Sequence, residues 1–241
     1  MLIQTVKDFQ FVSGAIDAPS NLHPFGQSLA PKPLIFYVLD DNSRNVSVLD
    51  IGFGAGGLGA LIRSHAGTSH WAIDGIDGFR PNCLNVNLIS QRLYRNIWFG
   101  DTRELDPGFL RSYSIICLLD VIEHLDIESA KYVIRLLLSG MRDDAFLFIS
   151  TPLYFMPQHS FQEGDLEEHL ICVPATSMVG LSPTLVCINE PLIAGFVLNK
   201  ASLTTVDLFQ PISNRNFDLA TGTRVLERCG IPFLPLKVFK Y

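Results

Sequence analysis

A glycine-rich turn that follows a buried strand constrains the fold of this chain more than any other feature. Residues 46–51 are mostly apolar and predict a short buried strand. Gly52, Gly54 and Gly56 follow at once, and residues 57–65 then read as a helix. A side chain in such a turn would hold a ligand away from the backbone, so the glycines indicate a ligand that approaches the main chain at a helix start.

The turn is compatible with two kinds of ligand. Gly52, Gly54 and Gly57 satisfy G-x-G-x-x-G, and Asp77 follows about 20 residues later, where a dinucleotide-binding fold places its ribose acid. This pattern favours an NAD(P)-dependent oxidoreductase. Asp50, however, extends the motif to D-x-G-x-G-x-G. A carboxylate at that point suits a ligand with positive charge better than a pyrophosphate.

A second motif favours the positively charged ligand. The apolar run 114–119 leads into Asp-Val-Ile-Glu-His-Leu at residues 120–125. The glycine stretch with Asp50 resembles the first motif of the class I S-adenosylmethionine-dependent methyltransferases. Residues 120–125 resemble their fourth motif, which lines the methionine end of the cofactor. The resemblance implies S-adenosyl-L-methionine, which carries an ammonium and a sulfonium, as the cofactor.

Buried strands alternate with helices along the chain. Continuous apolar runs such as 114–119 indicate strands covered on both faces, as in a parallel sheet between two helix layers. The resemblance implies a Rossmann-like three-layer αβα sandwich with a mostly parallel seven-stranded sheet and one antiparallel strand near the C-terminus. The predicted strands are 46–51, 71–76, 96–99, 114–119, 145–150, 184–189 and 192–198, and the main predicted helices are 57–65, 81–93, 126–141, 175–181 and 221–229.

The resemblance also implies which residues bind the cofactor. Asp77 is expected to accept the ribose hydroxyls, with Asp74 as its rival and a helix cap as the alternative role for either. Asp101 is expected near the adenine amino group or, equally, as the cap of a helix that begins at Thr102. The full predicted set is Asp50, Gly52, Phe53, Gly54, Gly56, Asp77, Gly78, Asp101, Thr102, Asp120 and Val121.

The candidates for catalysis are histidines. A sulfonium is already a good methyl donor, so the protein mainly has to align the reacting atoms and exclude water. A general base is needed only if the acceptor must lose a proton, and His124 is a candidate for it or a packing residue. His159 and His169 lie in a loop after the strand 145–150, where ligands bind in open α/β sheets.

The same loop is similar to that of a subgroup of the class, which carries Ser-Thr-Pro, a Gln, a Gly-Asn and an E-x-H. Here Ser150-Thr151-Pro152, Gln158, Gly164 and Glu167 to His169 match. Asp165 stands where the subgroup has Asn, and Val173 stands where it often has Trp. The substrate class is therefore not carried over.

Charge and motif content favour a small-molecule acceptor. The chain has 18 basic and 24 acidic residues, a net charge of −6, and so no general attraction for nucleic acid or anionic lipid. It also has no Asn-Pro-Pro-Tyr-like tetrapeptide after the fourth strand and no Pro-Cys pair. The first absence counts against methylation of a base amino group, and the second counts against methylation of a cytosine carbon. We expect O- or N-methylation of a small molecule, with a non-catalytic S-adenosylmethionine-binding protein as the alternative.

The expected organisation is one methyltransferase domain in the cytoplasm. Residues 1–45 form an N-terminal arm and helix, 46–150 the cofactor-binding core, and 151–241 the substrate loop, C-terminal hairpin and tail. Within the arm, 1–21 is expected to be loosely structured with room for a short helix, and 23–41 to be helical.

The five cysteines form no C-x-x-C pair, which indicates neither a zinc site nor a disulfide framework. Residues 169–189 carry no formal charge, but Pro174, Gly180 and Pro183 interrupt them, so no membrane span is expected.

Overall fold

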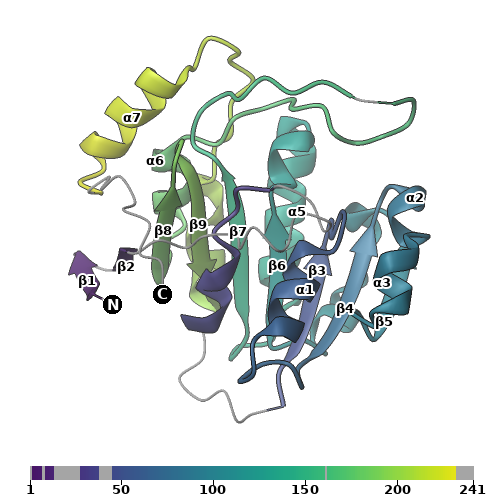
Figure 1. Ribbon diagram of the computed structural model, residues 1–241. Coiled ribbons are helices and arrows are strands. Elements are labelled where there is room, and N and C mark those ends of the chain that lie inside the picture. The colour runs from purple at the N-terminus through teal and green to yellow at the C-terminus, as the bar shows by residue number, and fades with distance from the viewer. Residues whose placement is uncertain (1, 7–8, 14–27, 38–44, 161, 232–241) are drawn as a thin grey trace.

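The strands form one nine-stranded mixed sheet in the order β1-β2-β8-β9-β7-β6-β3-β4-β5 (Figure 1). The computed structural model describes residues 2–6, 9–13, 28–37, 45–160 and 162–231. The strands are β1 (Leu2–Val6), β2 (Phe9–Ser13), β3 (Ser47–Ile51), β4 (Ala72–Asp77), β5 (Asn96–Phe99), β6 (Ile115–Leu119), β7 (Phe146–Pro152), β8 (Leu185–Asn189) and β9 (Ile193–Leu198).

Seven of these strands reproduce the predicted core. The strands β5, β4, β3, β6 and β7 are parallel to one another, whereas β9 is antiparallel to both β7 and β8. The predicted mostly parallel seven-stranded sheet with one antiparallel strand near the C-terminus is confirmed.

The N-terminal arm differs from the prediction. Within the range expected to be loosely structured, β1 and β2 form an antiparallel pair, and β2 adds to the sheet parallel to β8 through Gln10 and Phe11. The expectation was wrong because a short strand at the sheet edge is stabilised by the strand beside it, which local sequence patterns do not reveal.

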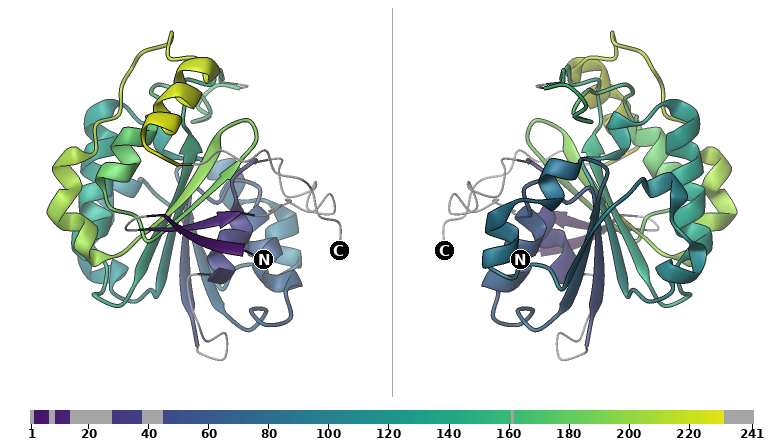
Figure 2. Two further views of the ribbon diagram at one scale, coloured as in Figure 1. Left: turned by 90° about the vertical axis from the view of Figure 1, so that its left-hand side faces the viewer. Right: turned by 90° about the vertical axis from the view of Figure 1, so that its right-hand side faces the viewer.

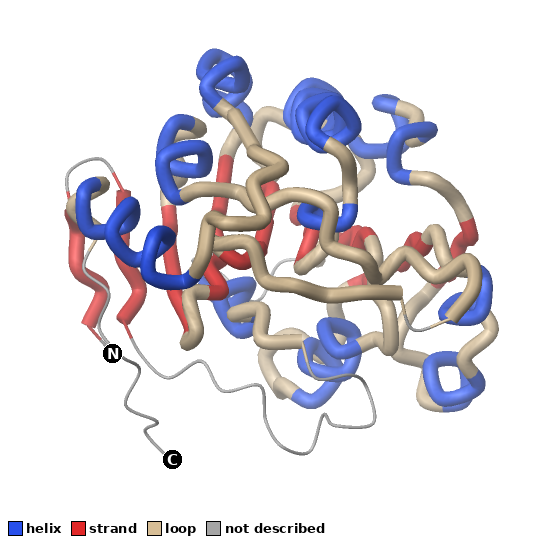
Figure 3. The backbone as a smooth tube through the Cα atoms, turned by 90° about the horizontal axis from the view of Figure 1, so that it is seen from above, coloured by secondary structure: helices blue, strands red, loops and turns tan. Residues whose placement is uncertain are grey.

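Helices cover both faces of the sheet, as seen edge-on in Figure 2 and from above in Figure 3. On one face, the buried core includes residues of α4, α5, α6, η5 and α7; on the other it includes residues of η2, α1 and α3. This confirms the three-layer sandwich. The helices are η2 (Lys32–Tyr37), α1 (Gly57–Ser64), α2 (Arg80–Cys83), α3 (Val86–Ser90), η3 (Thr102–Glu104), α4 (Pro107–Leu110), η4 (Ile122–His124), α5 (Ile127–Gly140), α6 (Ala175–Gly180), η5 (Lys200–Leu208) and α7 (Leu219–Arg228).

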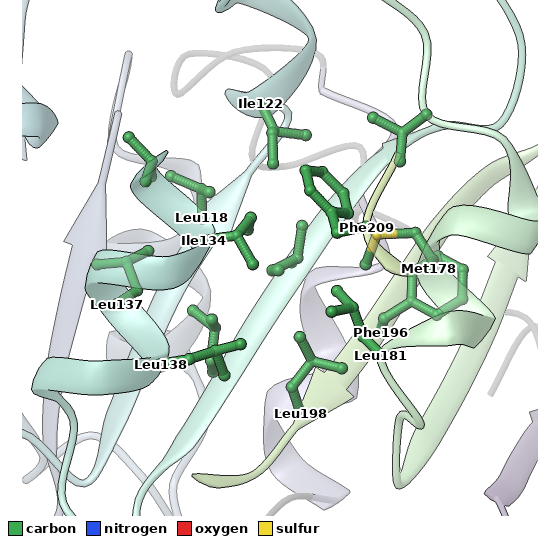
Figure 4. Close-up of a cluster of buried hydrophobic side chains, with 14 of the residues drawn as sticks. Leu118, Ile122, Ile134, Leu137, Leu138, Met178, Leu181, Phe196, Leu198 and Phe209 are labelled. Atoms are coloured by element: carbon green, nitrogen blue, oxygen red, sulfur yellow. The ribbon is translucent and has the colours of Figure 1, made fainter. Parts of the chain in front are cut away.

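The central strands are buried on both sides. In β6, Ile116 and Leu118 belong to the core under α5, whereas Ile115 and Cys117 belong to the core under α1. Figure 4 shows Leu118 beside Ile134 of α5 in the larger core, with Phe196 at the other side of the cluster, beside Met178 and Leu181. Burial on both faces explains the uninterrupted apolar runs in the sequence and makes the strand ends a rigid base for side chains beyond them.

Two helical predictions need correction, and one helix was missed. The helix expected over 81–93 is two short helices, α2 and α3, because the Asn85 side chain accepts the backbone N–H of Asn87 and starts a new helix. Of the helix expected over 23–41, the described part 28–37 contains only the 3-10 helix η2, which begins beside Pro31 and Pro33; the remainder lies outside the described residues. The 3-10 helix η5 was not predicted.

No helix in the described part of the chain is long and apolar enough to cross a membrane.

Candidate functional site: a cluster of acids at the carboxyl ends of three strands

Three acidic side chains meet at the carboxyl edge of the sheet. Asp50 lies near the end of β3, Asp77 ends β4, and Asp120 follows β6 directly. Because β6, β3 and β4 are adjacent and parallel, these ends lie side by side. The structure therefore brings together residues that the sequence placed in three separate motifs, at the edge where open α/β sheets bind ligands.

The glycine loop between β3 and α1 is open on one side. Gly52, Gly54 and Gly56 have φ values of 69°, 54° and 88°, which L side chains rarely adopt. A Cβ on Gly52 would lie 2.4 Å from Cγ2 of Val121, whereas a Cβ on Gly54 would meet nothing within 4 Å. The loop is thus packed at Gly52, and at Gly54 its backbone borders open space that can receive a ligand.

Asp77 connects the glycine loop to the end of β4. Its carboxylate accepts hydrogen bonds from the backbone N–H of Gly54 at 2.9 Å, from the N–H of Phe79 at 2.7 Å, and from Asn82 Nδ2 at 3.2 Å. These bonds leave lone pairs on a carboxylate that lies against the loop. Its role as the acceptor of the ribose hydroxyls stays a prediction.

The rival acid, Asp74, is part of the structural core instead. It accepts hydrogen bonds from Arg95 Nε at 3.0 Å, from the hydroxyl of Tyr113 at 2.9 Å, and from both the backbone and the side chain of Asn96. Burial raises the pKa of Asp74, but these hydrogen bonds outweigh it and lower the pKa overall. Asp74 therefore joins β4 to β5 and to the segment between α4 and β6.

Asp50 is the most deeply buried of the three acids. It is 2% exposed, and its Oδ2 accepts a 2.7 Å hydrogen bond from the hydroxyl of Tyr94. Burial raises the pKa of Asp50 to about 6, although Tyr94 and the positive charge of Lys32 oppose the shift. A cationic ligand beside Asp50 would favour its charged form.

Lys32 and Ser28 belong to the pocket but were not predicted. Ser28 Oγ donates a hydrogen bond to Asp120 and accepts one from Lys32 Nζ at 2.7 Å. Lys32 is buried, which lowers its pKa, while the charges of Asp120 and Asp50 raise it. The available signal was a lysine between two prolines in an otherwise apolar stretch.

Asp120 is also held from the neighbouring strand. Ser150 Oγ donates to its Oδ1 at 2.7 Å, and its backbone N–H donates to the Ser150 carbonyl at 3.0 Å. Ser150 thus orients the Asp120 carboxylate, and the Ser-Thr-Pro motif has a positional role at the end of β7.

The remaining predicted cofactor residues line the same edge with different roles. Phe53 is buried against Tyr94, with ring centroids 5.2 Å apart. A Cβ on Gly78 would lie 2.8 Å from Cδ1 of Leu166, so the loop after β7 passes over the end of β4. Asp101 caps η3 through the N–H of Arg103 and pairs with the Arg103 guanidinium. The capping alternative foreseen for Asp101 is therefore present, with Thr102 as the first residue of that helix.

Two of the three candidate histidines lie together. The rings of His124 and His169 are 4.6 Å apart between centroids and meet edge to face. His124 Nδ1 lies 3.2 Å from the carbonyl oxygen of Glu168, and His169 Nδ1 lies 2.6 Å from that of Met156. His159 is exposed in the same loop and lies outside this pair. Burial lowers the pKa of both His124 and His169 and so favours neutral rings.

Glu123 is a third member of the group that sequence reasoning did not assign. It is 2% exposed, and burial, followed by the charge of Asp120, raises its pKa well above the ordinary value. Its backbone carbonyl accepts the N–H groups of Leu170 and Ile171, which holds His169 beside it. The sequence separates Glu123 from His169 by the whole of α5 and β7, so no local spacing indicates their contact.

No protein-family model and no curated protein sequence matches the chain. Among solved structures, a SAM dependent methyltransferase from Aquifex aeolicus superimposes with a TM-score of 0.51 over 74% of this chain and 92% of its own, at 16% identity. An S-adenosylmethionine-dependent methyltransferase from Clostridium acetobutylicum has a TM-score of 0.42 and 15% identity, with 55% of each chain covered. A coclaurine N-methyltransferase, solved with N-methylheliamine and SAH, has a TM-score of 0.38 and 18% identity over 48% of this chain and 34% of its own.

The superposition on the Aquifex aeolicus structure defines the class of fold. The chain has the fold of class I S-adenosylmethionine-dependent methyltransferases, as its strand order and its superposition on the Aquifex aeolicus structure show. It spans 55% and 34% of the lengths of the Clostridium acetobutylicum and coclaurine enzymes, less than two thirds of either.

Proposed function

We propose that the protein is an S-adenosylmethionine-dependent methyltransferase that acts on a small molecule by O- or N-methylation. The observation that carries the proposal is the meeting of Asp50, Asp77 and Asp120 around a glycine loop that is open at Gly54. Acids at three adjacent strand ends suit a ligand with positive charge and free hydroxyls.

The residues present fit this cofactor. Asp77 would accept the ribose hydroxyls, and Asp50 and Asp120 would face its positive groups. Lys32, a buried cation held by Ser28, would form an ion pair with the carboxylate of the methionine moiety. Once bound, the cofactor supplies a methyl group on a sulfonium, which is a good leaving group.

The pocket gives less support to an NAD(P)-dependent oxidoreductase. A pyrophosphate at this turn would use free backbone N–H groups at the helix start. Here the N–H of Gly54 donates to Asp77, and the neighbouring Asp50 would repel a phosphate when ionised. Both features oppose an anion at the turn.

The roles of the protein in catalysis would be alignment, exclusion of water and proton removal where the acceptor needs it. His124 and His169 are neutral-ring candidates for the base, and their position beyond β6 and under the loop after β7 supports this role. These polar groups favour an enzyme over a cofactor-binding protein without activity. His159, exposed in the loop, is the weaker candidate.

We further propose one methyltransferase domain that acts in the cytoplasm without a nucleic-acid partner. The five cysteines are all free, and three of them are buried, which supports a reducing compartment. The net charge of −6 supports an acceptor other than nucleic acid.

Calorimetric titration with S-adenosylmethionine, S-adenosylhomocysteine and NAD tests the proposal. We expect micromolar binding of the first two and none of NAD, with a large loss for Asp77→Ala and no change for the exposed control Asp143→Ala. Mass spectrometry across a panel of small hydroxyl and amine acceptors then tests activity. Binding of NAD alone would contradict the cofactor assignment, and cofactor binding without any methylated product would favour the non-catalytic alternative.

A further inference from the structure

The side chains of Glu123, His124 and His169 converge on one point. Each offers one metal-ligand atom, and these atoms all lie within 4.8 Å of one another. Two of the residues come from η4 directly after β6, and the third comes from the loop after β7. Around a tetrahedral ion with bonds of about 2.1 Å, ligand atoms lie about 3.4 Å apart, so small side-chain rotations would close the group on a cation.

Hydrogen bonds orient both imidazole rings for this role. A backbone carbonyl only accepts, so the Nδ1 atoms that lie against the Glu168 and Met156 carbonyls must carry the protons. In a neutral ring, the lone pair then resides on Nε2. Metal-binding histidines in proteins typically donate their other N–H to a carbonyl or carboxylate in this way.

The carboxylate of Glu123 supplies the second, independent observation. Glu123 is 2% exposed, and within the part of the chain that the structure describes neither its Oε2 nor the nearby hydroxyl of Thr151 has a hydrogen-bond partner at normal geometry. A buried carboxylate oxygen without a partner costs free energy unless it is protonated or binds a cation. A cation bound between this carboxylate and the two imidazoles, whose ligand atoms all lie within 4.8 Å of one another, would compensate that cost.

We propose that Glu123 and the Nε2 atoms of His124 and His169 bind one divalent first-row transition-metal ion. Two imidazoles and one carboxylate suit ions such as Zn²⁺, Mn²⁺ or Fe²⁺ better than an all-oxygen site for Ca²⁺. Three protein ligands leave coordination positions open, as in catalytic rather than structural sites.

The site has a consequence for the substrate, which rests on the proposed function. An open position on the ion, at the same edge of the sheet as Asp120, would take an oxygen of the methyl acceptor and lower the pKa of its hydroxyl. With Nε2 on the ion and Nδ1 against a carbonyl oxygen, neither His124 nor His169 could then act as the general base, so the hydroxyl proton would pass to solvent. An O–CH₃ bond would form as the S–CH₃ bond breaks, and the products would be a methyl ether and S-adenosylhomocysteine. The acceptor class is then a hydroxyl compound.

Cobalt titration tests the metal site without relying on activity. Full-length protein, with any affinity tag removed, is stripped with EDTA and titrated with Co²⁺ while its visible absorption is recorded. We expect saturation at one equivalent. Glu123→Gln and His169→Gln should each weaken Co²⁺ affinity by at least about tenfold, whereas the exposed control His70→Gln should not change it.

Parallel S-adenosylmethionine titrations separate this proposal from the proposed function. Glu123→Gln should retain cofactor binding, because Glu123 is not one of the predicted cofactor residues. Cofactor binding by a wild-type protein that takes up no Co²⁺ would overturn the metal site alone. Equal Co²⁺ affinity in wild type and both variants would do the same. Circular dichroism confirms folding, and if one variant fails to fold, the other decides.

Discussion

The hydroxyl of Tyr94 donates a 2.7 Å hydrogen bond to Oδ2 of Asp50. Both groups are buried, so this bond stabilises the carboxylate of the first motif. Tyr94 lies in the segment between α3 and β5, where no sequence motif indicates this role. A hydrogen bond to a charged group contributes about 1.5–3 kcal/mol. Tyr94 thus acts on the cofactor pocket through Asp50.

Replacement of Tyr94 by phenylalanine tests this relationship. Tyr94→Phe should raise the pKa of Asp50 further and weaken S-adenosylmethionine binding several-fold at pH 7, with the ring packing against Phe53 retained. Calorimetry measures the affinity. The exposed Tyr132→Phe is the control, and an unchanged affinity in Tyr94→Phe would show that the bond does not affect the pocket.

Cofactor affinity should depend on pH through Asp50. Its pKa rises from 3.8 to about 6 on folding, so between these values the folded protein holds more protons than the unfolded chain. The contribution of Asp50 to the stability of the ligand-free protein is therefore lost as pH rises through this window. A cationic cofactor needs the charged form, so its affinity should fall below pH 6, by up to about tenfold per pH unit.

Titrations from pH 5 to 8 measure this dependence. Lys32, Tyr94 and Asp77 are the groups that act on the carboxylate of Asp50. Asp50→Asn should bind more weakly and without the pH dependence. A wild-type affinity that stays constant across the range would contradict the prediction.

Lys32 should discriminate between cofactors with and without a carboxylate. Lys32→Met should weaken S-adenosylmethionine binding by about tenfold or more, because the loss of a charge-assisted contact costs about 1.5–3 kcal/mol. Binding of 5′-methylthioadenosine, which has no carboxylate, should change much less. Lys131→Met, on the outer face of α5, is the matched control. Equal losses for both ligands would mean that Lys32 only maintains the pocket.

Alanine substitutions at two glycines of the loop should differ in their effects on protein stability and on cofactor binding. Alanine at Gly52 or Gly54 forces a positive φ on an L residue, which costs about 1–2 kcal/mol. Gly52→Ala also clashes with Val121 and should lower the melting temperature more than Gly54→Ala. Gly54→Ala places its methyl in the open space and should weaken cofactor binding more. Thermal unfolding measures the melting temperatures of both variants, and calorimetry measures their cofactor affinities. A lower melting temperature for Gly54→Ala, or weaker cofactor binding by Gly52→Ala, would contradict the prediction.

Asp74 and Asp77 should show opposite phenotypes. Asp74→Ala removes the partner of Arg95, Tyr113 and Asn96 and should destabilise the protein by roughly 2–4 kcal/mol. The folded fraction should still bind the cofactor. Asp77→Ala should lose cofactor binding with a smaller change in stability. Chemical denaturation and calorimetry distinguish the two, and a binding loss in Asp74→Ala alone would restore Asp74 as the ribose acid.

The sequence by itself determined the elements whose signal is local. The strand β3, the turn at Gly52 to Gly56 and the start of α1 follow from apolar periodicity and glycine spacing. Asp50, Asp77 and Asp120 could be placed at one edge because the carboxyl ends of parallel strands meet there. The seven-stranded order was accessible only through the resemblance to a known fold.

The tertiary structure alone decided which distant residues meet. Lys32 lies near Asp50 and Asp120 because η2 packs on the face that carries α1, and Glu123 meets His169 because the loop after β7 returns over β6. The pairing of β2 with β8 arose in the same way. Periodicity describes one segment at a time, whereas these contacts depend on strand order and loop path, which few local residues encode.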